Sequence, residues 1–231
     1  MKVDIGIIGA MASEVDGLVA ALSEHESETV GGILYHTGML EGKRVAIARC
    51  GVGKVFAAIC AEAMIIKYSP SLVINTGVGG ALAAGLKTTD IVIADKLCQH
   101  DMDTSPLGDP KGLVSGINKI YFDTDERAVG ILKSSAERLG LNAYVGTVAS
   151  GDKFVADKSD KDRIVSQFRA MACEMEGAAV AHVAFVNETR FAVIRAISDS
   201  ADGDATMDYP TFMPIAAKAS SMLTRELIRE Y

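Results

Sequence analysis

The sequence predicts an α/β protein built on a mixed or mostly parallel sheet with helices on both faces. Two observations carry this prediction: short apolar runs alternate with helical patterns from end to end, and Gly-rich segments follow several of those runs. No repeat or linker interrupts the order. A length of 231 residues fits one globular domain, so we expect a single domain over residues 1–231.

The first half of the chain contains two helical patterns. Apolar residues recur at helical spacing between Val15 and Leu22, and Ser13 is the expected N-cap. A long apolar stretch at 54–68 predicts a second helix that ends before Ser69-Pro70. Between these helices, runs of β-type residues predict strands at 3–8, 33–37, 44–49, 72–76 and 91–94, with a turn at Glu41-Gly42.

The second half opens on a segment without a clear period. Residues 99–118 hold prolines, glycines and aspartates, which predicts a long loop with a functional or interface role. A polar hinge is expected at 150–152. Helices are predicted at about 125–139, about 157–168, from Gly177 and from about Tyr209, and strands at 143–149, 171–175 and 191–197.

Composition excludes several classes of protein. The net charge is −7 and the basic residues are scattered, whereas a nucleic-acid binder needs a basic stripe. No run of about 18 apolar residues is present, so no membrane-spanning helix is expected. We expect a cytoplasmic protein with its four cysteines reduced, because no two of them form a Cys-x-x-Cys pair (Cys50, Cys60, Cys98 and Cys173).

Three Gly-rich segments follow predicted strands, at 6–10, 51–53 and 77–80. None completes the dinucleotide fingerprint or the phosphate-binding loop with its Lys and hydroxyl. They are interpreted either as tight strand-to-helix turns or as places where the backbone approaches a ligand. The segment 100–103 holds one His and two Asp, but no further His or Cys lies near, which favours an ordinary loop. No cofactor and no metal ion is predicted.

Acidic residues recur near the ends of predicted strands. Glu14 lies in the first turn of a helix, where a carboxylate also stabilises the N-terminus. Strand alternation puts Glu174 and Glu176 on one face, which a core does not normally accept. Asp199 ends a strongly apolar strand, where a simple turn acid also fits. Arg195 lies inside that strand and therefore needs a carboxylate partner, for which one of these acids is the candidate.

Motifs along the whole chain resemble those of the 5′-methylthioadenosine/S-adenosylhomocysteine nucleosidases, a family within the nucleoside phosphorylase superfamily. The motifs are, in order, GIIGAMASEV, GVGKVFAA, INTGVGGAL, HDMDTSPLG, SGDKF, CEMEGAAVAHVA and AISDSAD. The resemblance implies a three-layer sandwich around a central mixed, partly closed sheet. It also implies a homodimer that hydrolyses the N-glycosidic bond of both nucleosides, and of 5′-deoxyadenosine, in methionine salvage.

The resemblance also implies a role for each acid. Glu14 would position and activate water, and Asp199, held by Ser198, would protonate the purine at N7. Glu176 would bind the ribose hydroxyls, with Met175 beside it under the sugar. These residue types suit the reaction, because the sugar becomes oxocarbenium-like and the base leaves well only when it is protonated.

Further residues would shape the substrate pocket. Phe154 follows the hinge, where an aromatic ring could stack on a flat base or fill the core. The resemblance favours stacking on adenine, with the Val155 backbone at the base edge, Gly80 against the ligand and Arg195 supporting the carboxylates. Val78 stands where the family often has a small hydroxyl residue, which puts one hydrogen bond near the ribose or water in doubt.

The 5′ pocket is expected to carry the other departures from the family. Val52 and Tyr209 would line it, together with Thr104 and Leu107 of the dimer partner. Tyr209 stands where phenylalanine is frequent, and Thr104 and Leu107 replace a more frequent valine and aromatic residue. These differences bear on the preference among 5′-substituents more than on the chemistry.

The nucleophile separates two reactions of the superfamily. A phosphorylase needs arginines or equivalent donors for phosphate, but residues 9–16 and 76–86 contain no cation and the middle Gly segment has only Lys54. Glu14 would also repel phosphate, so hydrolysis is predicted, with water and a small nucleoside as reactants. An aminofutalosine-type nucleosidase, a purine nucleoside phosphorylase and a non-catalytic nucleotide-binding module remain the alternatives.

Overall fold

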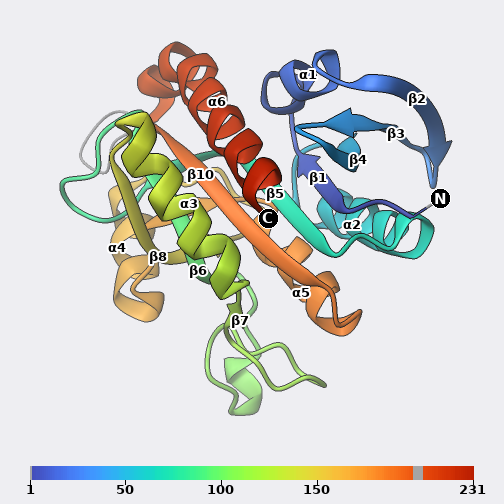
Figure 1. Cartoon of the computed structure of the whole chain (residues 1–231). Coiled ribbons are helices and arrows are strands. Elements are labelled where there is room, and N and C mark those ends of the chain that lie inside the picture. The colour runs from blue at the N-terminus through green and yellow to red at the C-terminus, as the bar shows by residue number, and fades with distance from the viewer. Residues whose placement is uncertain (1, 200–204) are drawn as a thin grey trace.

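A computed structural model of the chain describes residues 2–199 and 205–231, with side chains from Thr211 onward in the second range. Helices cover both faces of one large twisted sheet (Figure 1). Within the described ranges, no helix combines the length and the apolar character that crossing a membrane requires. The strands are β1 (Ile5–Gly9), β2 (Ser23–Val30), β3 (Ile33–Leu40), β4 (Lys43–Arg49), β5 (Leu72–Ala81), β6 (Ile91–Gln99), β7 (Phe122–Asp123), β8 (Ala143–Ser150), β9 (Ala172–Glu174) and β10 (Arg190–Asp199). The helices are α1 (Ala12–Ala20), α2 (Lys54–Tyr68), the short 3₁₀ helix η1 (Ser105–Leu107), α3 (Glu126–Leu139), α4 (Lys158–Phe168), α5 (Gly177–Val186) and α6 (Ala205–Glu230).

The sheet is mixed and partly closed, as predicted. Its strand order is β10-β6-β8-β9-β5-β1-β4-β3-β2, with β7 paired to β6. Strand β10 also pairs with β5, so β5, β9, β8, β6 and β10 form a closed ring from which the other strands extend as a wing. Strands β4, β1, β5 and β10 run parallel, and their carboxyl ends therefore meet at one edge. Ligands of α/β folds bind at such an edge.

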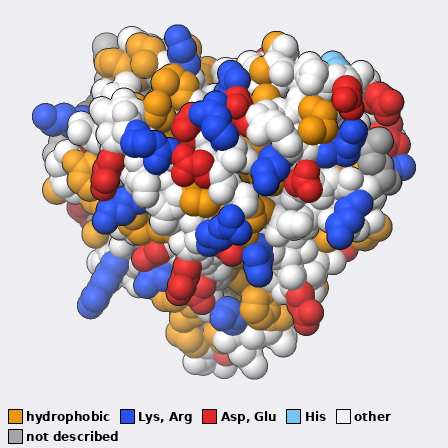
Figure 2. Space-filling model, in the orientation of Figure 1, with side chains coloured by type: hydrophobic (Ala, Val, Ile, Leu, Met, Phe, Trp, Pro, Cys, Tyr) orange, Lys and Arg blue, Asp and Glu red, His pale blue; other side chains and the backbone are white. Residues whose placement is uncertain are grey.

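The helices form the two outer layers. Helices α1 and α3 contact α6 on one face, where Leu18 and Leu132 pack into a core shared with Leu223 and Leu227. Helices α2 and α5 contact each other on the opposite face, over a second core. Figure 2 shows lysines, arginines and acidic side chains interspersed over the face that carries α3 and α6, in line with the scattered charges of the sequence.

Local details correct three of the sequence predictions. The N-cap of α1 is Met11 and not Ser13, which lies inside the helix. The polar segment 23–30 forms strand β2, which the sequence pattern missed because nearly all of its residues are exposed at the edge of the sheet. The short strand β7 was missed as well. The turn at Glu41-Gly42 is confirmed, with positive φ at both residues.

Two of the three Gly-rich segments are strand and not turn. Residues 6–9 lie in β1, and β5 runs through 77–80 to Ala81. Only 51–53 is a turn, and Gly51 and Gly53 there have φ of 94° and 102°, values that L side chains rarely adopt. The glycines of β5 are explained instead by carboxylates packed against them, as described below.

Candidate active site

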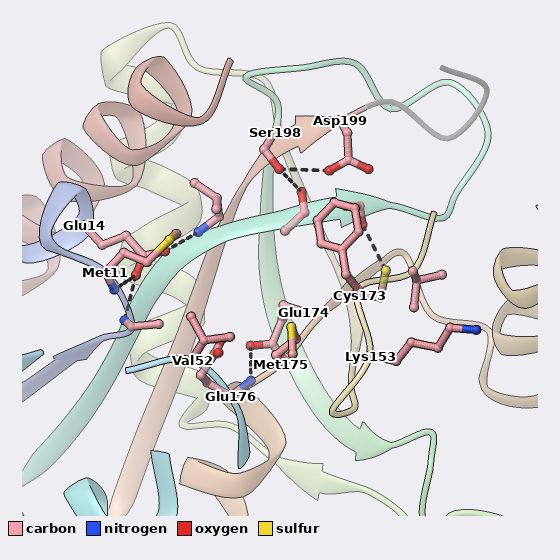
Figure 3. A pocket seen from close by; sticks show the side chains of 16 residues that line it. Met11, Glu14, Val52, Lys153, Cys173, Glu174, Met175, Glu176, Ser198 and Asp199 are labelled. Atoms are coloured by element: carbon pink, nitrogen blue, oxygen red, sulfur yellow. Dashed lines mark hydrogen bonds between the residues drawn. The ribbon is translucent and has the colours of Figure 1, made fainter. Parts of the chain in front are cut away.

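A cavity with about 570 Å³ of empty space opens where the carboxyl ends of β1, β5 and β10 meet. Figure 3 shows Glu14 at one end of the cavity, Asp199 at the other, and Met175 with Glu176 between them. The lining residues are Ala10, Met11, Glu14, Val52, Val78, Gly79, Gly80, Lys153, Phe154, Val155, Cys173, Glu174, Met175, Glu176, Ser198 and Asp199.

Glu14 enters the cavity from the first turn of α1 and is held by three backbone donors. Its Oε2 accepts from the N–H groups of Ala10 (2.7 Å) and Met11 (2.9 Å), and its Oε1 accepts from that of Val78 (3.1 Å). A Cβ on Gly77 would lie 2.6 Å from Oε1, so this strand position admits only glycine without movement of the carboxylate. Burial raises the pKa of Glu14 above its ordinary value, against the opposing charge of Arg195 and the three N–H donors.

Glu174, at the end of β9, is the carboxylate partner that buried Arg195 requires. The two side chains form an ion pair with 2% of each exposed. Arg195 Nε donates to Glu174 Oε2 over 3.1 Å and Nη2 donates to the same oxygen. Burial alone would raise the pKa of Glu174, but Arg195, the Ser150 hydroxyl and the Gly177 N–H together hold it below its ordinary value.

Glu176 stands at the start of α5 and has a different environment. The strand ends at Glu174, so strand alternation does not extend to Glu176, although both carboxylates line the cavity. Its Oε1 accepts a hydrogen bond of 2.8 Å from the Gly53 N–H of the positive-φ turn. Burial and the neighbouring charge of Glu174 raise the pKa of Glu176 to about 7, while Arg195 opposes the shift.

Asp199 closes the other end of the cavity, with 2% of the residue exposed. The Ser198 hydroxyl lies 2.9 Å from Asp199 Oδ1 and 3.3 Å from the carbonyl oxygen of Gly79. A Cβ on Gly80 would lie 2.9 Å from Asp199 Oδ2. The glycines at 77 and 80 therefore give two carboxylates direct access to the backbone of β5.

The remaining wall is formed by the segment after β8 and by β9. Phe154 keeps 47% of its surface exposed, whereas its neighbour Val155 is buried. Lys153 is the one cation among the described lining residues, and its ammonium forms an ion pair with Asp160. Burial raises the pKa of the Cys173 thiol to about 12, so the thiol is neutral near pH 7.

Ten of the fourteen residues predicted for the site line this cavity. Arg195 is buried behind the wall, with 1% exposed. Thr104 and Leu107 lie on the loop that carries η1 and do not line the cavity, and Leu107 is 85% exposed. The side chain of Tyr209 lies outside the described residues.

Sequence reasoning missed several lining residues, although their positions carried a signal. Ala10 and Met11 directly follow β1, Lys153 stands between the hinge and Phe154, and Cys173 directly precedes Glu174. In the loop at 100–103, the Asp101 carboxylate contacts Lys54 Nζ (2.6 Å) and the Asp152 N–H (2.9 Å). Among the described residues, no group of three His, Cys, Asp or Glu side chains is placed to hold a metal ion.

Comparisons with known proteins agree on one family. Residues 4–229 match the model of the phosphorylase superfamily. A 5′-methylthioadenosine/S-adenosylhomocysteine nucleosidase of Actinobacillus succinogenes is 37% identical over 227 residues, which cover 98% of each chain. One from Haemophilus influenzae is 38% identical over 225 residues, covering 97% of this chain and 98% of that one.

Solved structures give the same result for the fold. The nucleosidase of Neisseria meningitidis in complex with methylthio-immucillin-A superposes with a TM-score of 0.95 and 33% identity, covering 99% of each chain. A futalosine hydrolase of Helicobacter pylori superposes with a TM-score of 0.94 and 33% identity, covering 99% of this chain and 98% of that one.

Proposed function

The chain belongs to the phosphorylase superfamily and, within it, to the 5′-methylthioadenosine/S-adenosylhomocysteine nucleosidases, and we propose that Glu14, Glu176 and Asp199 perform its N-glycosidic hydrolysis. The enzyme releases adenine and the 5′-substituted ribose. The observation that carries the proposal is the meeting of these three buried carboxylates in one cavity with an aromatic side chain on its wall. The bond between C1′ and N9 breaks, N7 of the base receives a proton, and water adds to C1′ and loses a proton.

Asp199 is proposed as the general acid. The anionic purine is a poor leaving group, and protonation at N7 makes it neutral. Asp199 is buried, and the Ser198 hydroxyl beside Oδ1 fixes the orientation of the carboxyl group. Oδ2 lies 2.9 Å from the place of a Cβ on Gly80, so the missing side chain makes room for the carboxyl group at this wall of the cavity. Phe154 would stack on the purine, and the Val155 backbone would pair with its edge.

Glu14 is proposed as the base that orients and deprotonates water. Its three backbone hydrogen bonds fix both oxygens without using all of their lone pairs. Its raised pKa makes it a stronger base than an exposed glutamate. Glu14→Gln keeps the shape of the side chain and is expected to abolish adenine release in a protein that still folds. Near-normal turnover in this variant would remove Glu14 from the role.

Glu176 is proposed to hold the ribose hydroxyls, with Met175 beneath the sugar. One of its oxygens is fixed by Gly53 N–H, which leaves the other oxygen for a hydroxyl donor. A carboxylate near the sugar also stabilises the positive charge that develops in the transition state. Val78 offers its N–H to Glu14 but no side-chain hydroxyl to the ribose or the water.

Water, and not phosphate, is the attacking group. Arg195 does not line the cavity, and the Lys153 ammonium is paired with Asp160, so no described lining residue offers an unpaired cation to an anion. We expect the enzyme to release adenine from 5′-methylthioadenosine in phosphate-free buffer, and chromatography measures the adenine that is released. A strict requirement for phosphate would contradict the hydrolase mechanism and favour a phosphorylase.

A homodimer is proposed on the strength of one exposed apolar face. Helices α2 and α5 contact each other, and the large apolar side chains exposed on them are Val55, Phe56, Ile59, Ile66, Phe185 and Val186. A second copy that covers this face would bring its Thr104 and Leu107 to the 5′ end of the cavity. Light scattering tests this: Val55→Glu should give an inactive monomer, whereas Met222→Glu, exposed on α6, should keep the dimer.

The 5′-substituent is the open part of the substrate. The similarity to a futalosine hydrolase keeps an aminofutalosine-type nucleosidase as a second candidate. Rates of base release from 5′-methylthioadenosine, S-adenosylhomocysteine, 5′-deoxyadenosine, inosine and aminofutalosine, each with and without phosphate, rank these substrates.

We further propose that residues 1–231 form one nucleosidase domain, because the family match spans 4–229. The cytoplasmic location stays a prediction.

A further inference from the structure

Glu174 is a buried cavity carboxylate to which the proposed reaction gives no task. Its Oε2 accepts hydrogen bonds from Arg195 and from the N–H groups of Glu176 (3.0 Å) and Gly177 (2.7 Å). Its Oε1 accepts from the Ser150 hydroxyl. Both oxygens are therefore occupied by protein donors, and Glu174 is better placed to organise its neighbours than to bind a substrate.

Arg195 uses all five of its N–H donors within this network. Nε and one Nη2 hydrogen bind Glu174, the second Nη2 hydrogen binds Asn75 Oδ1, and Nη1 binds the carbonyl oxygens of Asn75 (3.2 Å) and Ile194 (2.9 Å). No donor is left for Glu14 or Glu176, which feel the guanidinium only through space. The charge of Arg195 is thus balanced by Glu174 at close range.

We propose that Glu174 is a positioning residue that keeps Arg195 paired, so that Arg195 does not capture Glu176, which holds the substrate sugar. This inference rests on the proposed function, since it assigns the control of Glu176 within the same site. Without the charge of Glu174, Arg195 would be the dominant charge behind the cavity. It would then attract the Glu176 carboxylate in competition with the sugar hydroxyls.

The charged and titratable groups that act on Glu176 come from four segments. They are Glu174 on β9, Arg195 on β10, Glu14 on α1 and the Cys50 thiol after β4. Removing the charge of Glu174 has two effects of the same sign: it ends a repulsion and leaves Arg195 uncompensated. Both lower the pKa of Glu176 from about 7.

The variant Glu174→Gln removes the negative charge of the side chain and keeps its shape. An amide oxygen can take the Oε2 position and keep the Arg195, Glu176 and Gly177 donors, and the amide nitrogen can donate to the Ser150 hydroxyl. The matched control is Ser150→Ala, which removes a neutral donor to Glu174 and the acceptor of the Ala178 N–H, but leaves the charge of Glu174 in place.

The experiment is the pH profile of kcat/KM, which reports groups of the free enzyme. We expect an acid limb near pH 7 in the wild type that moves down by about one to three units in Glu174→Gln and stays in place in Ser150→Ala. A uniform fall of kcat/KM with an unmoved limb in Glu174→Gln would mean a structural role only and would overturn the proposal.

A second variant tests the proposal if Glu174→Gln does not fold. Asn75→Asp puts another anion beside Arg195, in exchange for the hydrogen bond from Asn75 Nδ2 to the Ile8 carbonyl oxygen. It should move the acid limb upward, and an unmoved limb would again contradict the proposal. Failure of the proposed function looks different: the wild type would release no adenine at any pH.

Discussion

Glu176→Gln is expected to make the protein more stable and less active at alkaline pH. Glu176 is buried beside Glu174, and its pKa of about 7 exceeds the value of 4.5 for an unperturbed glutamate. The folded protein therefore holds the Glu176 proton more tightly than the unfolded chain does. This contribution to stability is fully present below about pH 4.5 and is lost as the pH rises through about 7.

The size of the effect follows from the shift. A difference of roughly 2.5 units (7 − 4.5) corresponds to about 3 kcal/mol at the limit of high pH. Weighting by the protonated fractions gives a loss of about 2 kcal/mol between about pH 5.5 and about pH 8.5. Glu176→Gln does not titrate, so its advantage over the wild type should grow by that amount, or about 4–8 °C in Tm.

Urea unfolding at both pH values tests this prediction. The matched control is Glu137→Gln, an exposed glutamate on α3, whose difference from the wild type should not change with pH. Adenine release measured on the same samples should fall in Glu176→Gln, because the ribose loses its charged acceptor. An equal difference between Glu176→Gln and the wild type at both pH values would refute the reasoning.

Three further substitutions test the site. Asp199→Asn should lower kcat about 10²–10⁴-fold in a chain that unfolds at the wild-type temperature, and near-normal kcat would exclude it as the general acid. Gly80→Ala puts a Cβ 2.9 Å from Asp199, so it should lower the free energy of unfolding by about 1–3 kcal/mol and displace the carboxyl group, seen as a fall in kcat/KM. Gly17→Ala, with open space around it, should leave kcat/KM unchanged, and an equal effect of both variants would contradict the packing at Gly80. Arg195→Met leaves Glu174 as a buried charge without its counterion, so it should lower the free energy of unfolding by about 3–5 kcal/mol. Unfolding curves that match those of the wild type would contradict a stabilising role of this ion pair.

The sequence pattern predicted the sheet and its helices because most of the core elements are strongly apolar. The pattern failed at β2, because an exposed edge strand needs no apolar side chains. The structure reveals this strand by its pairing with β3, which the sequence pattern does not show. The pattern also placed the glycines at 77–80 after the strand, either in a tight turn or where the backbone approaches a ligand. They lie within β5, and Gly77 is glycine because the Glu14 carboxylate packs where its Cβ would lie.

The acidic residues of the site could be predicted because they lie near the ends of predicted strands. The partner of Arg195 could be narrowed to a few carboxylates but not chosen, because the choice depends on how β9 and β10 approach each other in space. The opposite pKa shifts of Glu174 and Glu176 could not be predicted from the sequence either. One pKa lies below and the other above the ordinary value, because Arg195, the Ser150 hydroxyl and the Gly177 N–H outweigh burial at Glu174, whereas burial and the charge of Glu174 prevail at Glu176.

The closing strand of the ring has a consequence for synthesis of the protein. Strand β10 pairs with β5 and β6, which the ribosome delivers about a hundred residues earlier, and it carries both Arg195 and Asp199. A growing chain that stops before β10 holds Glu14 and Glu176 but lacks both Asp199, the proposed general acid, and Arg195, the counterion of Glu174. We therefore expect activity only after β10 is inserted, and no chain that stops before β10 should cleave nucleosides.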